Sequence, residues 1–171
     1  MQDINTLVTF SSRNGLTEKV ALAAALGAVQ ARSLIRLRWL RENVDDQILD
    51  RVPEWKENRR RMTREYIAPR EIDFLWADVL VIGMPARDGA SSIELKTYLG
   101  ALGALNSAGK LRGKVATAFA VDAELISLCS VLDGLDLIVV PPEASADRNA
   151  AEGARLLGQR VTEVARGLKP K

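Results

Sequence analysis

Short apolar runs alternate with helical segments along most of this chain, and this alternation constrains the fold more than any other feature. The runs are bounded by glycine, proline or polar residues, as strands usually are, and they cover residues 4–10, 79–82, 114–119 and 137–140. Residues 33–39 alternate polar and apolar side chains, which predicts an edge strand. The segments read as helices cover residues 17–31, 91–103, 123–133 and 147–168. Strands joined through helices predict right-handed crossovers, and therefore a doubly wound α/β fold with a parallel sheet and helices on both faces. With 171 residues, we expect a single domain spanning residues 1–171.

Apolar residues at helical spacing predict which faces the helices bury. The segment 17–31 is nearly continuous alanine, leucine and valine, so we expect most of its surface to be buried. The stripes predicted for the two longer helices that follow are Ile93, Leu95, Leu99 and Leu102, and Leu157, Val161, Val164 and Leu168.

Residues 41–70 are the least regular part of the chain. Pro53 and Pro69 interrupt them, and residues 54–66 in between predict a short, strongly charged surface helix. Because proline suits the first turn of a helix, Pro69 is expected to open a further short helix, with Glu71 and Asp73 near the positive end of its dipole.

The composition excludes several classes of chemistry. The chain has no histidine, which excludes Ser-His-Asp hydrolysis and histidine-ligated zinc. Its one cysteine, Cys129, excludes an internal disulfide framework and a cysteine-cluster metal site, and we expect it in the core. We therefore predict no metal, and if the protein is an enzyme, a cofactor carries the difficult chemistry.

The charge balance and the N-terminus point to a cytoplasmic protein. With 24 basic and 22 acidic residues, the net charge of +2 gives no sign of a nucleic-acid partner. The first residues have neither the basic nor the apolar region of a signal peptide. The longest apolar stretch, 20–29, is far shorter than the ~18 residues of a membrane span.

Three loops follow the predicted central strands, where doubly wound folds bind ligands: residues 11–17, 84–90 and 120–123. The first loop places Ser11, Ser12, Asn14, Gly15 and Thr17 before a helix N-terminus, where backbone N–H groups and short hydroxyl side chains can hold an anion. It has neither the GxxxxGK[ST] pattern nor GxGxxG, so we predict a phosphomonoester site rather than a triphosphate or dinucleotide site. An ordinary capped turn explains the same residues equally well.

Residues 10–21, Phe-Ser-Ser-Arg-Asn-Gly-Leu-Thr-Glu-Lys-Val-Ala, resemble the phosphate-binding loop of flavodoxins. The matching positions are Ser12, Gly15, Thr17 and Glu18, whereas Leu16 stands where the family usually has asparagine. The segment 83–99 resembles the WrbA-type NAD(P)H:quinone oxidoreductases, which share the flavodoxin-like fold, and 111–119 is similar to their next strand. The residues that match in that segment are Pro85, Arg87, Gly89, Thr97 and Leu99. The resemblance covers nearly the whole chain and is poorest over 41–70.

The resemblance implies a flavodoxin-like fold with five strands in the order 2-1-3-4-5 and a bound FMN. The phosphate would lie on Ser12, Arg13, Asn14, Gly15, Leu16 and Thr17. The ring would lie against Pro85, Ala86, Arg87, Asp88 and Gly89, with the third loop, Ala120, Val121 and Asp122, beside it. The Gly89 backbone would face flavin N5, no side chain would be catalytic, NAD(P)H would be the co-substrate and a quinone the acceptor. A homodimer or homotetramer is expected, because the family often assembles.

The sequence departs from the family pattern in the second and third loops. Asp88 replaces a usual aromatic residue, and Ala120–Ala123 replace a loop rich in serine, threonine and glycine. Carboxylates at Asp88 and Asp122 near the ring would lower the flavin reduction potential. These departures leave open an alternative: a flavodoxin-like protein with weak or lost FMN binding, in a binding or electron-carrier role. The net charge of +2 argues against a carrier, because classical carriers dock through a strongly acidic surface.

Five basic residues gather in the charged segment: Lys56, Arg59, Arg60, Arg61 and Arg64. We favour a solvated helix face, because acidic residues are interleaved with them. Recognition of an acidic partner, or of the extra phosphate of NADPH, is the alternative.

Overall fold

The structure is a computed structural model that describes residues 3–85, 93–119, 124–142 and 150–169. Its strands form one parallel sheet in the order β2-β1-β3-β4-β5, which confirms the predicted fold and strand order. Their bounds are β1 Ile4–Phe10, β2 Ser33–Trp39, β3 Val79–Gly83, β4 Val115–Phe119 and β5 Ile138–Val139. β2 is an edge strand, as its alternating polar and apolar residues predict.

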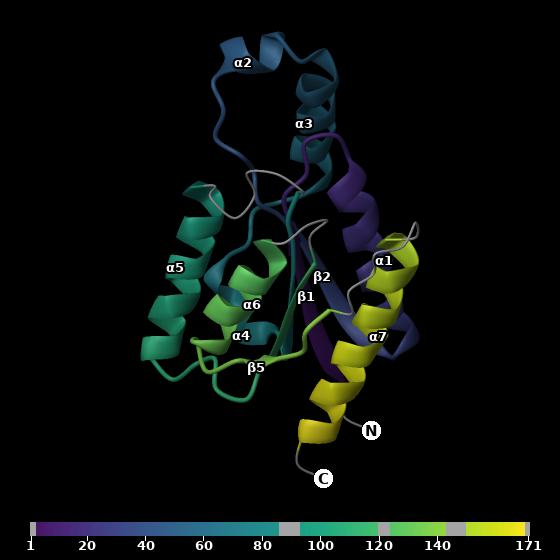
Figure 1. Cartoon of the computed structure of the whole chain (residues 1–171), viewed down its shortest axis with the longest axis vertical. Coiled ribbons are helices and arrows are strands. Elements are labelled where there is room, and N and C mark those ends of the chain that lie inside the picture. Colours follow the sequence, from purple (N-terminus) through teal and green to yellow (C-terminus); the bar gives the residue numbers. More distant parts are fainter. Residues whose placement is uncertain (1–2, 86–92, 120–123, 143–149, 170–171) are drawn as a thin grey trace.

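Helices cover both faces of the sheet (Figure 1). Their bounds are α1 Leu16–Gln30, α2 Asp46–Asp50, α3 Pro53–Glu65, α4 Glu71–Trp76, α5 Ile93–Ser107, α6 Glu124–Asp133 and α7 Ala150–Leu168. α1 and α7 pack on one face, and α4, α5 and α6 on the other. The core is accordingly split in two: in β1, Ile4 and Val8 point to the α1–α7 side and Leu7 to the other. Burial on both faces explains why β3 reads as a continuous apolar run.

α1 packs against α7 through small residues, and this corrects the expectation that most of its surface is buried. A Cβ atom added to Gly27 would lie 1.8 Å from the carbonyl oxygen of Arg155, and one added to Gly158 would lie 2.0 Å from that of Ala24. Alanines therefore fill the buried side of α1, whereas Leu22 and Leu26 are 42% and 51% exposed. The helix buries its small residues and leaves its large ones in solvent.

The predicted buried residues of α5 and α7 are correct in the middle of each stripe but wrong at one end of each helix. Leu95 and Leu102 are fully buried, but Ile93 begins α5 beyond the reach of the core and is 69% exposed. Leu168 is 51% exposed, because the C-terminal end of α7 extends past the sheet (Figure 1). β5 is shorter than predicted and ends before Pro141 and Pro142, which have no N–H group to donate to a neighbouring strand.

The connection from β2 to β3 rises above the carboxyl ends of the strands and carries α2 and α3 (Figure 1). The sequence predicted α3 but not the five-residue α2. Met62 anchors α3 and Leu49 anchors α2, since the first side chain is fully buried and the second nearly so. α4 begins at Glu71 rather than at Pro69.

No helix among the described residues is both long enough and apolar enough to cross a membrane.

Candidate functional site

The three predicted loops begin side by side at the carboxyl edge of the sheet. Phe10 pairs with Gly83, and Gly83 pairs with Phe119, so β1, β3 and β4 end level with one another. The Ser11 N–H group donates to the carbonyl of Gly83 (3.0 Å), and the Met84 N–H group donates to that of Phe119 (3.0 Å). The topology thus brings the carboxyl ends of β1, β3 and β4 together, as expected for this fold.

Only the first loop is described completely. In the second loop the description reaches Pro85, which is half-buried. The remaining predicted site residues lie outside the described residues: Ala86, Arg87, Asp88, Gly89, Ala120, Val121 and Asp122.

The first loop, residues 11–17, is a tight turn into α1. Gly15 is the N-cap of the helix and has φ +86°, a left-handed conformation that glycine adopts with little strain. The Ser12 hydroxyl accepts a hydrogen bond from the Gly15 N–H group (3.1 Å), and the Asn14 side chain accepts one from the Leu16 N–H group (3.1 Å). Two loop side chains therefore hold the turn in shape.

The remaining donors of the loop suit a phosphate. The N–H groups of Arg13, Asn14 and Thr17 have no acceptor among the residues that the structure describes. They lie at the positive end of a 15-residue helix, beside the largely buried hydroxyls of Ser12 and Thr17. Unpaired N–H groups at a helix N-terminus match the acceptor oxygens of an anion, so the loop fits the phosphate group of FMN.

The Arg13 side chain is engaged within the protein. Its Nε donates to both carboxylate oxygens of Glu42, at 2.9 and 3.3 Å, and its guanidinium lies over the Trp55 ring, 4.8 Å from the centroid. The Ser11 hydroxyl donates to the same carboxylate (3.1 Å). Arg13 thus neutralises a buried carboxylate beside the loop, and its backbone N–H group remains available to an anion.

A second buried carboxylate, Glu18, lies in the first turn of α1. Arg61 of α3 binds both of its oxygens, one at 3.0 Å, and the Tyr66 hydroxyl donates to it at 2.8 Å. Burial raises the pKa of Glu18, but the hydrogen bonds from Arg61 and Tyr66 and the charge of Arg61 outweigh it, so the pKa lies below its ordinary value. Glu18 is therefore ionised at neutral pH, and its charge is compensated.

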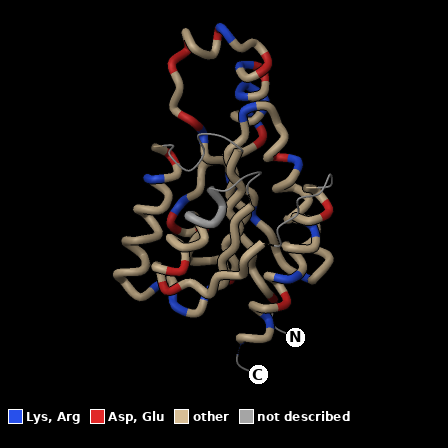
Figure 2. The backbone as a smooth tube through the Cα atoms, viewed as in Figure 1, with Lys and Arg blue, Asp and Glu red and all other residues tan. Residues whose placement is uncertain are grey.

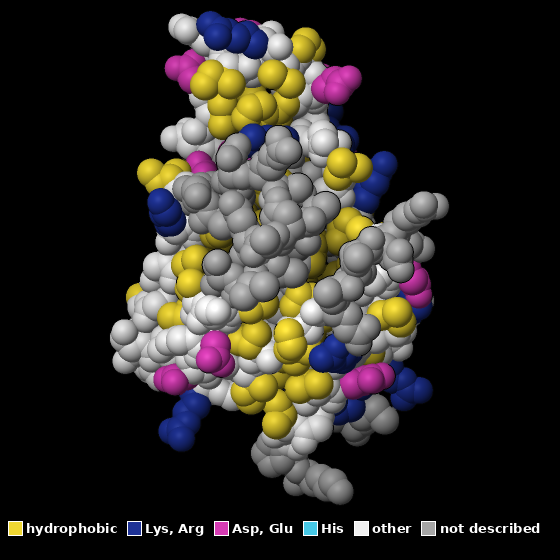
Figure 3. Space-filling model, viewed as in Figure 1, with side chains coloured by type: hydrophobic (Ala, Val, Ile, Leu, Met, Phe, Trp, Pro, Cys, Tyr) yellow, Lys and Arg dark blue, Asp and Glu magenta, His cyan; other side chains and the backbone are white. Residues whose placement is uncertain are grey.

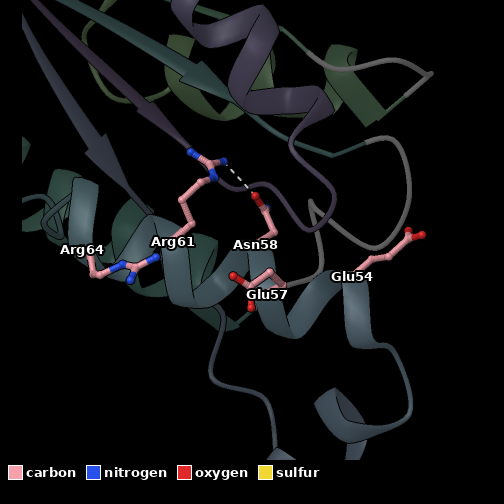
Figure 4. Close-up of a pocket in the computed structure, with 5 residues that line it drawn as sticks. All are labelled: Glu54, Glu57, Asn58, Arg61 and Arg64. Atoms are coloured by element: carbon pink, nitrogen blue, oxygen red, sulfur yellow. Dashed lines mark hydrogen bonds between the residues drawn. The ribbon is translucent and has the colours of Figure 1, made fainter.

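Asn58 connects α3 directly to the loop. Its Nδ2 donates to the carbonyl oxygen of Arg13 (3.0 Å), and its Oδ1 accepts from Arg61 (2.8 Å). Asn58 and Arg61 point toward each other at an open pocket of about 440 Å³, whose other lining residues are Glu54, Glu57 and Arg64 (Figure 4).

The basic residues of α3 are interleaved with acidic ones at the end of the molecule formed by α2 and α3 (Figure 2). Lys56 pairs with Asp50, and Arg60 lies 3.9 Å from Glu57. Hydrophobic side chains also reach the surface at this end (Figure 3). The favoured interpretation, a solvated helix face, describes these residues, but Arg61 forms an interior contact that the sequence did not indicate.

The residues that surround the loop were not identified as site residues from the sequence: Glu42, Trp55, Asn58, Arg61 and Tyr66. One signal was available, because Glu18 is an isolated acidic residue in an otherwise apolar helix, and a buried carboxylate needs a cationic partner. Nothing in the sequence indicated which of the many arginines supplies it. Within the described residues, no group of acidic residues and cysteine is arranged to hold a metal ion.

No protein-family model matches the chain. Several curated proteins are similar to it, and their names all contain NAD(P)H dehydrogenase (quinone). A protein of Archaeoglobus fulgidus named NAD(P)H dehydrogenase (quinone) is 27% identical over 188 residues, covering 95% of this chain and 97% of that protein. A Deinococcus radiodurans protein of the same name is 28% identical over 115 residues, covering 67% of this chain and 57% of that protein. NAD(P)H dehydrogenase (quinone) 3 of Rhizobium meliloti is 30% identical over 113 residues, covering 66% and 50%.

Solved structures show the same fold. A flavodoxin, WrbA-like protein from Agrobacterium tumefaciens superposes with a TM-score of 0.64 at 22% identity, covering 98% of this chain and all of that one. An archaeal flavodoxin superposes with a TM-score of 0.63 at 15% identity, covering 95% and 99%. The sheet order and these solved structures agree: the chain has a flavodoxin-like fold.

Proposed function

We propose that this protein is an FMN-dependent oxidoreductase that reduces quinones with NAD(P)H. The observation that carries the proposal is the loop 11–17, whose unpaired N–H groups lie at the N-terminus of α1 and fit a phosphate. Support for the redox chemistry comes from the relatives named NAD(P)H dehydrogenase (quinone). When bound, FMN supplies the transfer of two electrons from NAD(P)H to a quinone.

The chain's own contribution is to hold and orient the cofactor. The phosphate is proposed to lie on Ser12, Arg13, Asn14, Gly15, Leu16 and Thr17, chiefly on their N–H groups and hydroxyls. The ring is proposed to lie against Pro85, Ala86, Arg87, Asp88 and Gly89, beside Ala120, Val121 and Asp122. No side chain has to serve as an acid or base in this scheme, which is compatible with a chain that has no histidine.

The test is an anaerobic assay of the FMN-loaded protein with NADH, with NADPH and with a simple benzoquinone. We expect one nicotinamide to be oxidised for each quinone reduced, with activity that depends on added FMN. If the protein binds FMN but neither nicotinamide reduces it, the enzyme proposal is wrong and the electron-carrier alternative takes its place. If it does not bind FMN, both redox functions are excluded, and the alternative of lost cofactor binding, favoured by Ala120–Asp122, holds.

We further propose a cytoplasmic homodimer or homotetramer without a nucleic-acid partner. The exposed apolar stripe of α1 supports assembly, since Leu22, Leu26 and Val29 are all more than two-fifths exposed. Light scattering on the purified protein tests the oligomeric state. A monomer at every concentration would refute the proposed homodimer or homotetramer.

A further inference from the structure

Helix α3 makes three contacts with the loop 11–17 and the first turn of α1 that follows it. Asn58 donates to the carbonyl of Arg13 (3.0 Å), Arg61 binds the Glu18 carboxylate, and Trp55 lies under the Arg13 guanidinium. These contacts join residues more than 40 positions apart in the chain. They are made by a helix that the fully buried Met62 side chain fixes in place.

The contact from Asn58 fixes the direction of one donor in the loop. The peptide unit between Arg13 and Asn14 is planar and trans, so its carbonyl and its N–H group point in opposite directions. Asn58 holds that carbonyl on the side of α3. The Asn14 N–H group, which has no acceptor among the described residues, is therefore directed away from α3.

The contact from Arg61 controls the charge next to the loop. The Glu18 side chain is only 7% exposed and lies in the first turn of α1, where an uncompensated carboxylate would repel a phosphate dianion. Arg61 binds both of its oxygens and also donates to Asn58 at 2.8 Å. One arginine thus neutralises the carboxylate and holds the amide that orients the peptide unit.

We infer that α3 is a positioning element for the phosphate loop: through Asn58 and Arg61 it sets how strongly the protein prefers a phosphate-bearing flavin over the same flavin without phosphate. This inference rests on the proposed function. Asn58 and Arg61 are positioning residues, because they act through the Arg13–Asn14 peptide unit and through Glu18. The flavin ring contacts neither of them in this scheme.

The first test compares FMN with riboflavin, which lacks only the phosphate. Affinities are measured by flavin fluorescence for the wild type, Asn58→Ala, Arg61→Ala and Arg61→Lys. We expect Asn58→Ala and Arg61→Ala to lower the preference for FMN over riboflavin about tenfold, as loss of an oriented donor or of a charge partner predicts. Riboflavin affinity should stay within about threefold of wild type, and Arg61→Lys should fall in between, because lysine keeps the charge but not the bidentate geometry.

Arg60→Ala is the matched control on the same helix. Arg60 is 65% exposed and lies 3.9 Å from Glu57, so its removal changes the charge of α3 without touching the loop. We expect this variant to keep the wild-type preference. An equal loss in Arg60→Ala would mean that the overall charge of α3, and not the contacts of Asn58 and Arg61, sets the preference, which would overturn the inference.

Hydrogen exchange gives a second readout that does not require activity. In the ligand-free protein, Asn58→Ala should speed exchange over residues 11–19 by about fivefold or more, because local opening becomes easier. Since coupling between sites is reciprocal, FMN should slow exchange in α3 of the wild type more than riboflavin does. Suppose that the wild type prefers FMN while Asn58→Ala and Arg61→Ala keep that preference and show exchange over residues 11–19 at the wild-type rate. That result would overturn the inference and leave the proposed function intact. A wild type that binds neither flavin would overturn both.

Discussion

Arg13 and Glu42 form an ion pair, Nε to Oε2 at 2.9 Å, beside the loop 11–17 that we propose holds a phosphate. The Glu42 side chain is 11% exposed, so its carboxylate depends on Arg13 and on the Ser11 hydroxyl for compensation. A basic residue in such a loop suggests a direct ligand for the phosphate. The Arg13 guanidinium instead pairs with the Glu42 carboxylate.

This pairing predicts an unusual double-variant result. Arg13→Ala should weaken FMN binding about tenfold, because it leaves a buried negative charge beside the phosphate. Adding Glu42→Gln should restore the affinity to within about threefold of wild type. The negative charge at position 42 is then removed, while the glutamine side-chain oxygen can still accept the hydrogen bond from the Ser11 hydroxyl. Fluorescence titration of both variants checks this. A double variant as weak as Arg13→Ala would show that Arg13 binds the phosphate directly.

Glu18 predicts how stability depends on pH. Its folded-state pKa lies below the ordinary 4.5, so its contribution is complete above that pH and is lost as the pH falls through the folded-state pKa. At about pH 6, Glu18→Gln should be less stable than wild type by about 1–3 kcal/mol, because hydrogen bonds to a charged group are lost. Urea unfolding should show this difference shrinking as the pH falls below 4.5 and through the lowered folded-state pKa. A difference that is constant with pH would contradict the ion pair with Arg61.

Gly15 predicts a separation of stability from cofactor binding. Gly15→Ala should cost about 1–2 kcal/mol of stability, because alanine is strained at φ +86°, and it should weaken FMN binding by deforming the loop. Gly109→Ala is the control: its φ of +67° is equally unfavourable for alanine, but Gly109 follows α5, far along the chain from the loop. Thermal unfolding and FMN titration of the pair should show similar losses of stability and a loss of affinity in Gly15→Ala alone. Equal affinity losses would mean that the loop conformation has no special role.

The space around two helical glycines predicts opposite effects of alanine: Gly158 lies in the close contact between α7 and α1, and Gly100 lies on the exposed side of α5. Gly158→Ala would place its Cβ atom 2.0 Å from the carbonyl oxygen of Ala24, so the helices must separate, at a cost of about 1–3 kcal/mol. Gly100→Ala, in the exposed interior of α5 with nothing within 4 Å, should stabilise the protein by about 0.5–1 kcal/mol. Chemical denaturation of both variants measures the free energies of unfolding. A tolerated Gly158→Ala would contradict the close helix contact.

The sequence predicted the sheet well, because buried parallel strands such as β3 are continuous apolar runs between breakers. It also located the turn between β1 and α1 that we propose holds a phosphate, since Ser12 and Gly15 lie at the junction between a strand and a helix. Helix burial was harder to predict: α1 contains large and small apolar residues, and only the contact with α7 determines that the small ones face inward.

The contacts around the loop could not be predicted. Asn58, Arg61 and Glu42 come from residues 41–70, which have no regular period and the poorest family resemblance. Their partners are set by the path of the chain above the sheet, which short-range patterns do not specify. α2 was missed for a related reason, because five residues are too few to show a helical period.

The most direct test of the central claim is a titration of the cofactor-free protein with FMN, followed by flavin fluorescence, with riboflavin in parallel. Binding through the loop 11–17 predicts saturable FMN binding with a Kd in the micromolar range or tighter, and riboflavin binding at least about tenfold weaker, because the free N–H groups have no phosphate to hold. Absence of FMN binding at several hundred micromolar, or equal affinity for the two flavins, would contradict the claim that this loop holds the phosphate of FMN.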